Sequence, residues 1–105
     1  MVKLGLFVRL VAKSGKAAEL AQFLHQGLEL ANQEQTTPVW FAVQFDPSTF
    51  AVFDAFAAET GRQAHLNGQI AAALMAKAHE LLAEPPRIEK FEVLGAKLPG
   101  YFGPA

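Results

Sequence analysis

The segment from Phe50 to Gly68, FAVFDAFAAETGRQAHLNG, constrains the fold of this chain more than any other part of it. It begins as an apolar strand that carries one acid, Asp54, and continues into a short helix that ends near His65. A charge placed inside such an element must be paired or used, because removing it from water is costly. The imidazole follows the carboxylate by 11 positions, so the two groups can face one another across a pocket.

The composition sets the broad class. A chain of 105 residues is one domain, and a hydrophobic fraction of 51 % exceeds what so small a domain hides alone, so we expect a homodimer or a larger assembly. The formal charge is −1 and no run of Lys or Arg occurs, so nucleic acid and anionic membrane surfaces are not expected partners. There is no cysteine, so disulfides, thiolate metal sites and cysteine nucleophiles are excluded.

The N-terminal apolar run weakly imitates a signal peptide, but Arg9 interrupts it and no cleavage site follows. No apolar stretch reaches the roughly 20 residues of a transmembrane helix. The sequence therefore predicts a soluble, cytoplasmic protein.

Hydrophobic periodicity divides the chain into seven elements. Strands are predicted at 4–12, 39–45, 50–56 and 88–94, and helices at 16–34, 57–68 and 69–83. This β-α-β-β-α-α-β order is typical of a ferredoxin-like α+β fold, with a four-stranded antiparallel sheet covered by helices on one face. Residues 1–95 form this domain, and residues 96–105, which lack periodicity, are expected to be a C-terminal arm.

The second face of the predicted sheet is too apolar for water. Residue parity places on it Phe7, Val11, Trp40, Ala42, Val52 and Phe56. A second copy of the same sheet is the simplest cover for such a face.

These features resemble the antibiotic biosynthesis monooxygenase (ABM) domains of the dimeric α/β-barrel superfamily. The resemblance spans residues 4–94 and rests on the KSGK turn at 13–16, the hairpin end VFDAF at 52–56, the AHLN helix end at 64–67 and Pro85-Pro86. Two positions depart from the family: its hairpin usually carries Glu and Trp where Asp54 and Phe56 stand, and Gln69 replaces a frequent second His. The resemblance implies two sheets paired into a barrel.

Activities in the family include cofactor-independent oxygenation of polycyclic phenols, quinol oxygenation and haem degradation. Haem degraders have Asn, Trp and His at positions that hold Leu6 or Phe7, His65 and Met75 in this chain. The haem activity is therefore not expected, and the resemblance implies no bound cofactor. It favours a monooxygenase that oxidises a small phenolic, quinol or polycyclic aromatic substrate with dioxygen. The alternative is a non-catalytic small-molecule-binding or structural homodimer of the same fold.

The candidate site combines polar and aromatic residues assigned to the open face of the sheet. His65 is the candidate base, oriented by Asp54, and it would give a phenolate that reacts with dioxygen without a metal. Arg9 and Gln44 are candidate substrate anchors, and the candidate apolar wall consists of Phe7, Trp40 and Phe56.

Other interpretations of these residues stay open. His65 could cap a helix end or pack at the subunit contact, Asp54 and Arg9 could form an ion pair, and Trp40 could be core or interface filler. His25 and His79 are expected at the surface, and no two histidines have a ligand spacing, so no metal site is predicted.

Overall fold

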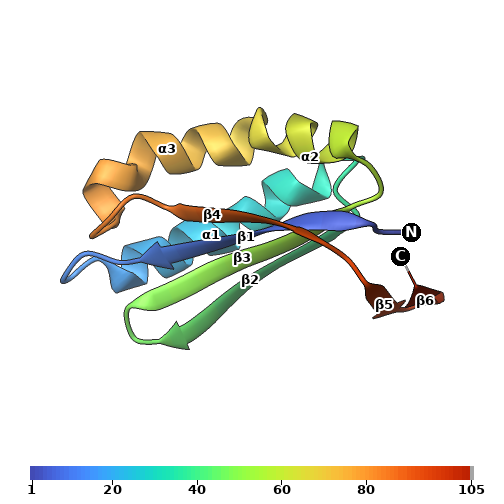
Figure 1. Cartoon of the computed structure of the whole chain (residues 1–105). Helices are drawn as coiled ribbons and strands as arrows, with labels where there is room; N and C mark the ends of the chain where they lie inside the picture. Colours follow the sequence, from blue (N-terminus) through green and yellow to red (C-terminus); the bar gives the residue numbers. More distant parts are fainter. Residues whose placement is uncertain (105) are drawn as a thin grey trace.

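The computed structural model describes residues 1–104, except for the side chains of residues 101, 102 and 104. The main sheet contains β1 (Leu4–Val11), β2 (Val39–Asp46), β3 (Thr49–Phe56) and β4 (Arg87–Glu92). The helices are α1 (Ala17–Asn32), α2 (Glu59–Leu66) and α3 (Gln69–Leu81), and the chain ends with β5 (Gly95–Leu98) and β6 (Tyr101–Pro104). Figure 1 shows the three helices on one side of the main sheet.

The main sheet is antiparallel with strand order β2-β3-β1-β4. This order, with all helices on one face, confirms the predicted α+β ferredoxin-like fold. The hairpin between β2 and β3 turns at Asp46, whose Oδ1 accepts hydrogen bonds from the backbone N–H groups of Ser48 and Thr49 at 2.9 Å. These hydrogen bonds satisfy the backbone N–H groups of the turn and fix the register of the hairpin.

The core lies between the sheet and the helices. Leu6, Val8 and Leu10 of β1 are buried on the helix side, as the alternation in that strand predicted. Leu20 and Leu24 of α1 belong to the same core cluster as Val8 and Leu10. Leu28 of the same helix is about half exposed, and Gly27 is buried.

The prediction assigned the alternating side chains of the β2–β3 hairpin to the wrong faces of the sheet. Asp54 lies opposite Leu6 in the register, so it shares the helix-covered face with that leucine. Trp40, Gln44 and Phe56 are on the same side of the sheet as Asp54, so their side chains also lie on the helix-covered face. Both sets of alternating side chains in the hairpin are apolar, so alternation alone could not show which set faces the helices. The prediction therefore placed the Asp54 carboxylate on the face without helices.

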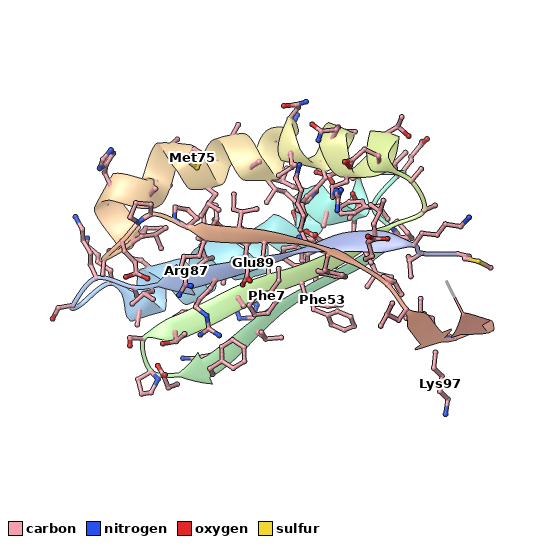
Figure 2. All side chains as sticks on the ribbon, viewed as in Figure 1. Phe7, Phe53, Met75, Arg87, Glu89 and Lys97 are labelled. Carbon is pink, nitrogen blue, oxygen red and sulfur yellow. The ribbon has the colours of Figure 1, made fainter. Side chains whose placement is uncertain are left out.

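The open face of the sheet is nevertheless apolar, with different residues on it. Phe41 (54 % exposed) and Phe53 (37 %) have ring centroids 6.3 Å apart, and Phe53 stacks on Phe91 at 5.2 Å. The Arg9 guanidinium lies over Phe45, 5.2 Å from the ring centroid. Figure 2 shows the side chains of Phe7, Phe53, Arg87 and Glu89 on this side. We call this surface the open face.

The C-terminal residues form a hairpin of their own. β5 pairs antiparallel with β6, and this two-stranded sheet is separate from the main sheet. The last anchored residue before it is Val93, whose N–H donates to the Lys3 carbonyl at 2.9 Å. Figure 1 shows the hairpin projecting beyond the end of the main sheet. The sequence predicted an arm here, and the strands within it were not predicted.

Candidate functional site

Three titratable side chains meet between the sheet and α2. His65 Nε2 lies 2.9 Å from Asp54 Oδ2, and His65 Nδ1 lies 2.5 Å from Glu34 Oε1. The predicted meeting of Asp54 and His65 is therefore present, with Glu34 as a third member. We call these residues the Glu34–His65–Asp54 cluster. Exposure falls along it, from 19 % for the Glu34 side chain to 8 % for His65 and 0 % for Asp54.

Each member comes from a different element. Asp54 is in the middle of β3, and His65 is in the last turn of α2, where its ring packs on Phe56 with centroids 5.5 Å apart. Glu34 lies in the loop that follows α1, and its Oε1 also accepts a 2.7 Å hydrogen bond from the Thr37 hydroxyl. The local fold therefore brings one carboxylate to each nitrogen of the imidazole ring.

Gly61 and Arg62 hold α2 close to the sheet and the α1–β2 loop. A Cβ on Gly61 would lie 2.9 Å from the Thr36 carbonyl oxygen, so only glycine permits this approach. Arg62 is paired with Glu59 through both Nε and Nη2 at 2.8 Å, and its Nη1 donates to the Gly5 carbonyl at 3.2 Å. These contacts fix the helix that carries His65.

Burial and charge act against one another in the cluster. Burial alone would lower the pKa of His65, but its contacts with the Asp54 and Glu34 carboxylates outweigh that effect and raise this pKa. Desolvation raises the pKa of Asp54, although the His65 imidazolium opposes that shift. Neither Asp54 oxygen has a well-aligned hydrogen-bond donor, so the short Asp54–His65 contact is an ion pair with poor hydrogen-bond direction. Asp54 and His65 therefore form a buried carboxylate–imidazole pair.

A pocket of about 330 Å³ opens beside the cluster. Glu34 and His65 line it, together with Leu30, Gln33, Thr36, Ala64, Gly68 and Gln69. We call it the cluster pocket. It offers amide groups and one carboxylate against a small apolar wall, a combination that suits a small polar aromatic molecule.

A second pocket, of about 300 Å³, lies between α1 and the edge strand β2. Trp40 and Gln44 line it with Leu24, His25, Leu28 and Phe50 among others. The Trp40 ring lies under Gly27, where a Cβ would be 3.5 Å from it, and its Nε1 is buried without a hydrogen-bond partner. We call this the Trp40 pocket.

The predicted site residues are therefore divided among several places. His65 lines the cluster pocket, with Asp54 and the fully buried Phe56 beneath it. Trp40 and Gln44 line the Trp40 pocket, and the Gln44 amide donates to the Asp46 carbonyl at 3.2 Å.

Arg9 and Phe7 lie on the open face, as predicted, on the side of the sheet away from Asp54. The alternative Asp54–Arg9 ion pair is therefore wrong, because the sheet separates the two side chains.

Glu34 was missed by the sequence reasoning. Its signal was an acid directly after the C-terminal end of α1, where the helix dipole disfavours negative charge. A carboxylate at that position is expected to have a cationic partner, and His65 is that partner.

Within residues 1–104, no group of three or more His, Cys, Asp or Glu side chains is arranged to hold a metal ion. Among the described helices, none has the length and apolar character needed to cross a membrane.

Comparison with solved structures identifies the family. NE2512, a protein of unknown function from Nitrosomonas europaea, is 68 % identical to this chain; the alignment covers 94 % of this chain and 96 % of that one, with a TM-score of 0.93. The chain belongs to the family of NE2512. No protein-family model and no curated protein matches the sequence.

More distant structures share the fold of this NE2512-family protein. PA3566 from Pseudomonas aeruginosa is 17 % identical, with a TM-score of 0.77 and coverage of 88 % of this chain and 94 % of that one. A Nitrosomonas europaea protein provisionally named an antibiotic biosynthesis monooxygenase is 17 % identical, with a TM-score of 0.78 and coverage of 88 % and 90 %. The family of NE2512 therefore has the ABM fold, and the predicted resemblance is confirmed at that level.

Proposed function

We propose that this protein is a cofactor-independent monooxygenase of the ABM type that oxidises a phenolic or quinol-type aromatic molecule with dioxygen. The observation that supports this proposal is the Glu34–His65–Asp54 cluster at the wall of the cluster pocket. A partly buried carboxylate–imidazole–carboxylate group is suited to accept a proton, because proton uptake reduces the charge held in a poorly solvated place.

The proposed reaction begins with loss of the substrate's hydroxyl proton to the cluster. The resulting phenolate is electron-rich, and its ring carbon gives electrons to dioxygen. For an anthrone-type substrate, one oxygen atom forms a bond to the ring carbon and becomes a carbonyl oxygen, the O–O bond breaks, and the second oxygen leaves as water with two substrate hydrogens. The carbon loses four electrons and dioxygen gains four, so no external reductant is consumed.

The lining of the cluster pocket favours substrates with more than one oxygen. Gln33 and Gln69 carry amides that donate and accept hydrogen bonds, whereas Leu30 and Ala64 offer apolar contact. A hydroquinone or a hydroxyanthrone matches this lining better than an unsubstituted hydrocarbon does.

We further propose that the protein works as a homodimer through its open face. Phe41, Phe45 and Phe53 are more than a third exposed there, which is a large apolar area for an isolated subunit. Arg9 and Arg87 lie opposite each other in the register of β1 and β4, and like charges at such positions destabilise a sheet. Glu89 lies on the same face, so two copies related by a twofold axis can supply opposite charges to one another.

A non-catalytic ligand-binding dimer is the second candidate, and one observation favours it. Both nitrogens of His65 already contact carboxylates, as they would in a purely structural cluster. In that case the Trp40 pocket, with its aromatic and aliphatic lining, would be the place for an apolar ligand.

Oxygen consumption separates the two candidates. Purified protein is incubated with a panel of hydroquinones and anthrones in an oxygen electrode, and products are identified by mass. We expect uptake of one dioxygen per quinone formed from an anthrone, and a decrease of about 100-fold or more in His65→Ala. The control is His79→Ala, which removes an exposed imidazole on α3. Uptake that is unchanged in His65→Ala would remove the cluster from the mechanism, and no uptake with any substrate would leave the binding dimer.

A further inference from the structure

The two oxygens of Glu34 have different surroundings. Oε1 is held by the Thr37 hydroxyl at 2.7 Å and by His65 Nδ1 at 2.5 Å. Oε2 makes no hydrogen bond within residues 1–104, and it lies 3.2 Å from the place where a Cβ on Gly68 would be. Gly68 lines the cluster pocket, so the missing side chain leaves Oε2 accessible from it. One oxygen of this carboxylate is therefore fixed, and the other faces the space that a substrate would occupy.

His65 has no such free atom. Its Nδ1 is directed to Glu34 and its Nε2 to Asp54, and only 8 % of its side chain is exposed. A ring with a carboxylate at each nitrogen is held as a donor at both, and a general base needs a lone pair within reach of the substrate proton. The sequence-based assignment of His65 as the base therefore fits the geometry less well than Glu34 does.

We infer that Glu34 is the catalytic base of the proposed reaction, that its Oε2 accepts the hydroxyl proton of a phenolic substrate, and that His65 and Asp54 are positioning residues that hold it. This inference rests on the proposed function. In the step, the O–H bond of the substrate breaks, its electron pair stays on the phenolate oxygen, and a new O–H bond forms at Oε2.

The step moves one negative charge and creates none. Two carboxylates and one imidazolium have a net charge of −1. When Glu34 takes the substrate proton, the cluster becomes neutral and the negative charge passes to the phenolate, where the aromatic ring delocalises it. Thr37 in the α1–β2 loop, Phe56 on β3 and Gln69 at the start of α3 adjoin the cluster, and none of these three is charged. Trp40 and Leu6, the residues opposite Asp54 in the sheet, are also uncharged.

The step is measured without oxygen, with 4-nitrophenol as a chromophoric phenol. Under nitrogen, at a pH where the free probe is mostly protonated, binding to the wild-type protein is expected to produce the phenolate absorption band. Glu34→Gln is expected to shift the protonation equilibrium of the bound probe by roughly tenfold or more, since one pKa unit is tenfold. The matched control is Glu29→Gln, which removes an exposed carboxylate from α1. Thermal unfolding of each variant verifies that it is folded.

A second variant keeps the carboxylate and obstructs it. Gly68→Ala places a methyl group 3.2 Å from Oε2 and equally close to the carbonyl oxygens of Ala64 and His65. The phenolate band is expected to weaken while Glu34 remains. Nitrogen NMR of the His65 ring gives an independent readout, and both nitrogens are expected to be protonated in the free protein at neutral pH.

The outcomes distinguish this inference from the proposed function. A phenolate band in Glu34→Gln equal to that of wild type, or no band in the wild type at saturating probe, would overturn the role of Glu34. A neutral His65 ring with an unprotonated nitrogen would assign the base to His65 instead. A band that depends on Glu34, in a protein that consumes no oxygen with any phenol, would keep the proton acceptor and reject the monooxygenase.

Discussion

Trp40 and Asp54 lie directly opposite one another on β2 and β3, and both side chains are on the helix-covered face of the sheet. The indole Nε1 and both carboxylate oxygens are buried without a well-aligned hydrogen-bond partner. Buried polar atoms without partners reduce stability by about 1–3 kcal/mol each, so their retention in the core is a feature to explain. Buried polar groups of this protein thus lie between the sheet and the helices, and the proposed chemistry belongs to that layer.

Gly27 provides the space for the Trp40 ring. A Cβ at this position would make an ordinary contact of 3.5 Å with the indole, so Gly27→Ala should be accommodated and should stabilise α1 by about 0.5–1 kcal/mol. Gly27→Leu should destabilise the fold, by about 1–3 kcal/mol, because the larger side chain needs the volume that the ring fills. Urea unfolding followed through Trp40, the single tryptophan, measures both. Equal stability of the leucine variant would contradict this packing.

The stability of the fold should decrease as the pH rises above neutrality. The pKa of His65 is raised from its ordinary value of 6.5, so its contribution is fully present below 6.5 and is lost as the pH rises through the folded-state pKa. The raised pKa of Asp54 acts in the same direction, from 3.8 upward. The unfolding free energies from urea denaturation at about pH 6 and about pH 9 should differ in the wild type, by up to about 3 kcal/mol, and much less in His65→Gln. An equal decrease in both proteins would place the titrating group elsewhere.

The apolar open face predicts a dimer, and one charged substitution on this face should disrupt it. Phe53 is between Phe41 and Phe91 in this surface, so Phe53→Glu should place a carboxylate in the contact and give monomers at micromolar concentration. Met75→Glu, on the outer surface of α3, is the matched control and should leave the dimer intact. Light scattering measures both variants. A wild-type monomer at the same concentration would contradict the proposed assembly.

The C-terminal hairpin should be dispensable for folding of the domain. Leu94, at its base, is almost fully exposed, and the Val93–Lys3 hydrogen bond precedes it. Deletion of residues 96–105 should therefore change the unfolding free energy of the monomeric Phe53→Glu background by no more than about 0.5 kcal/mol. Loss of cooperative unfolding would show that the predicted boundary at residue 95 is wrong.

The order and type of the main-sheet elements could be predicted because they depend on local periodicity. The faces of the β2–β3 hairpin could not, since both of its phases are apolar and either could cover the core. The pairing of Leu6 with Asp54 places Asp54 on the helix-covered face. The register between strands that are distant in the sequence is a tertiary property.

The cluster was half predicted. Asp54 and His65 come from neighbouring elements, so the motif that contains both indicated their meeting. Glu34 reaches the same imidazole from 31 positions earlier in the chain, and only the packing of the α1–β2 loop against α2 brings it there. The division of Arg9, Trp40 and His65 among separate surfaces likewise follows from the sheet, which keeps its two faces apart.

The most direct test of the central claim is to locate a bound substrate analogue by NMR. With isotope-labelled protein and a hydroxyanthrone added under nitrogen, we expect the largest chemical-shift changes at the His65 ring and at the backbone amides of Glu34, Gly68 and Gln69. The indole N–H of Trp40, a single resolved signal, should change little. Shifts concentrated at Trp40, Ala42 and Gln44, or at Phe7 and Phe53 on the open face, would contradict the assignment of the site to the cluster pocket.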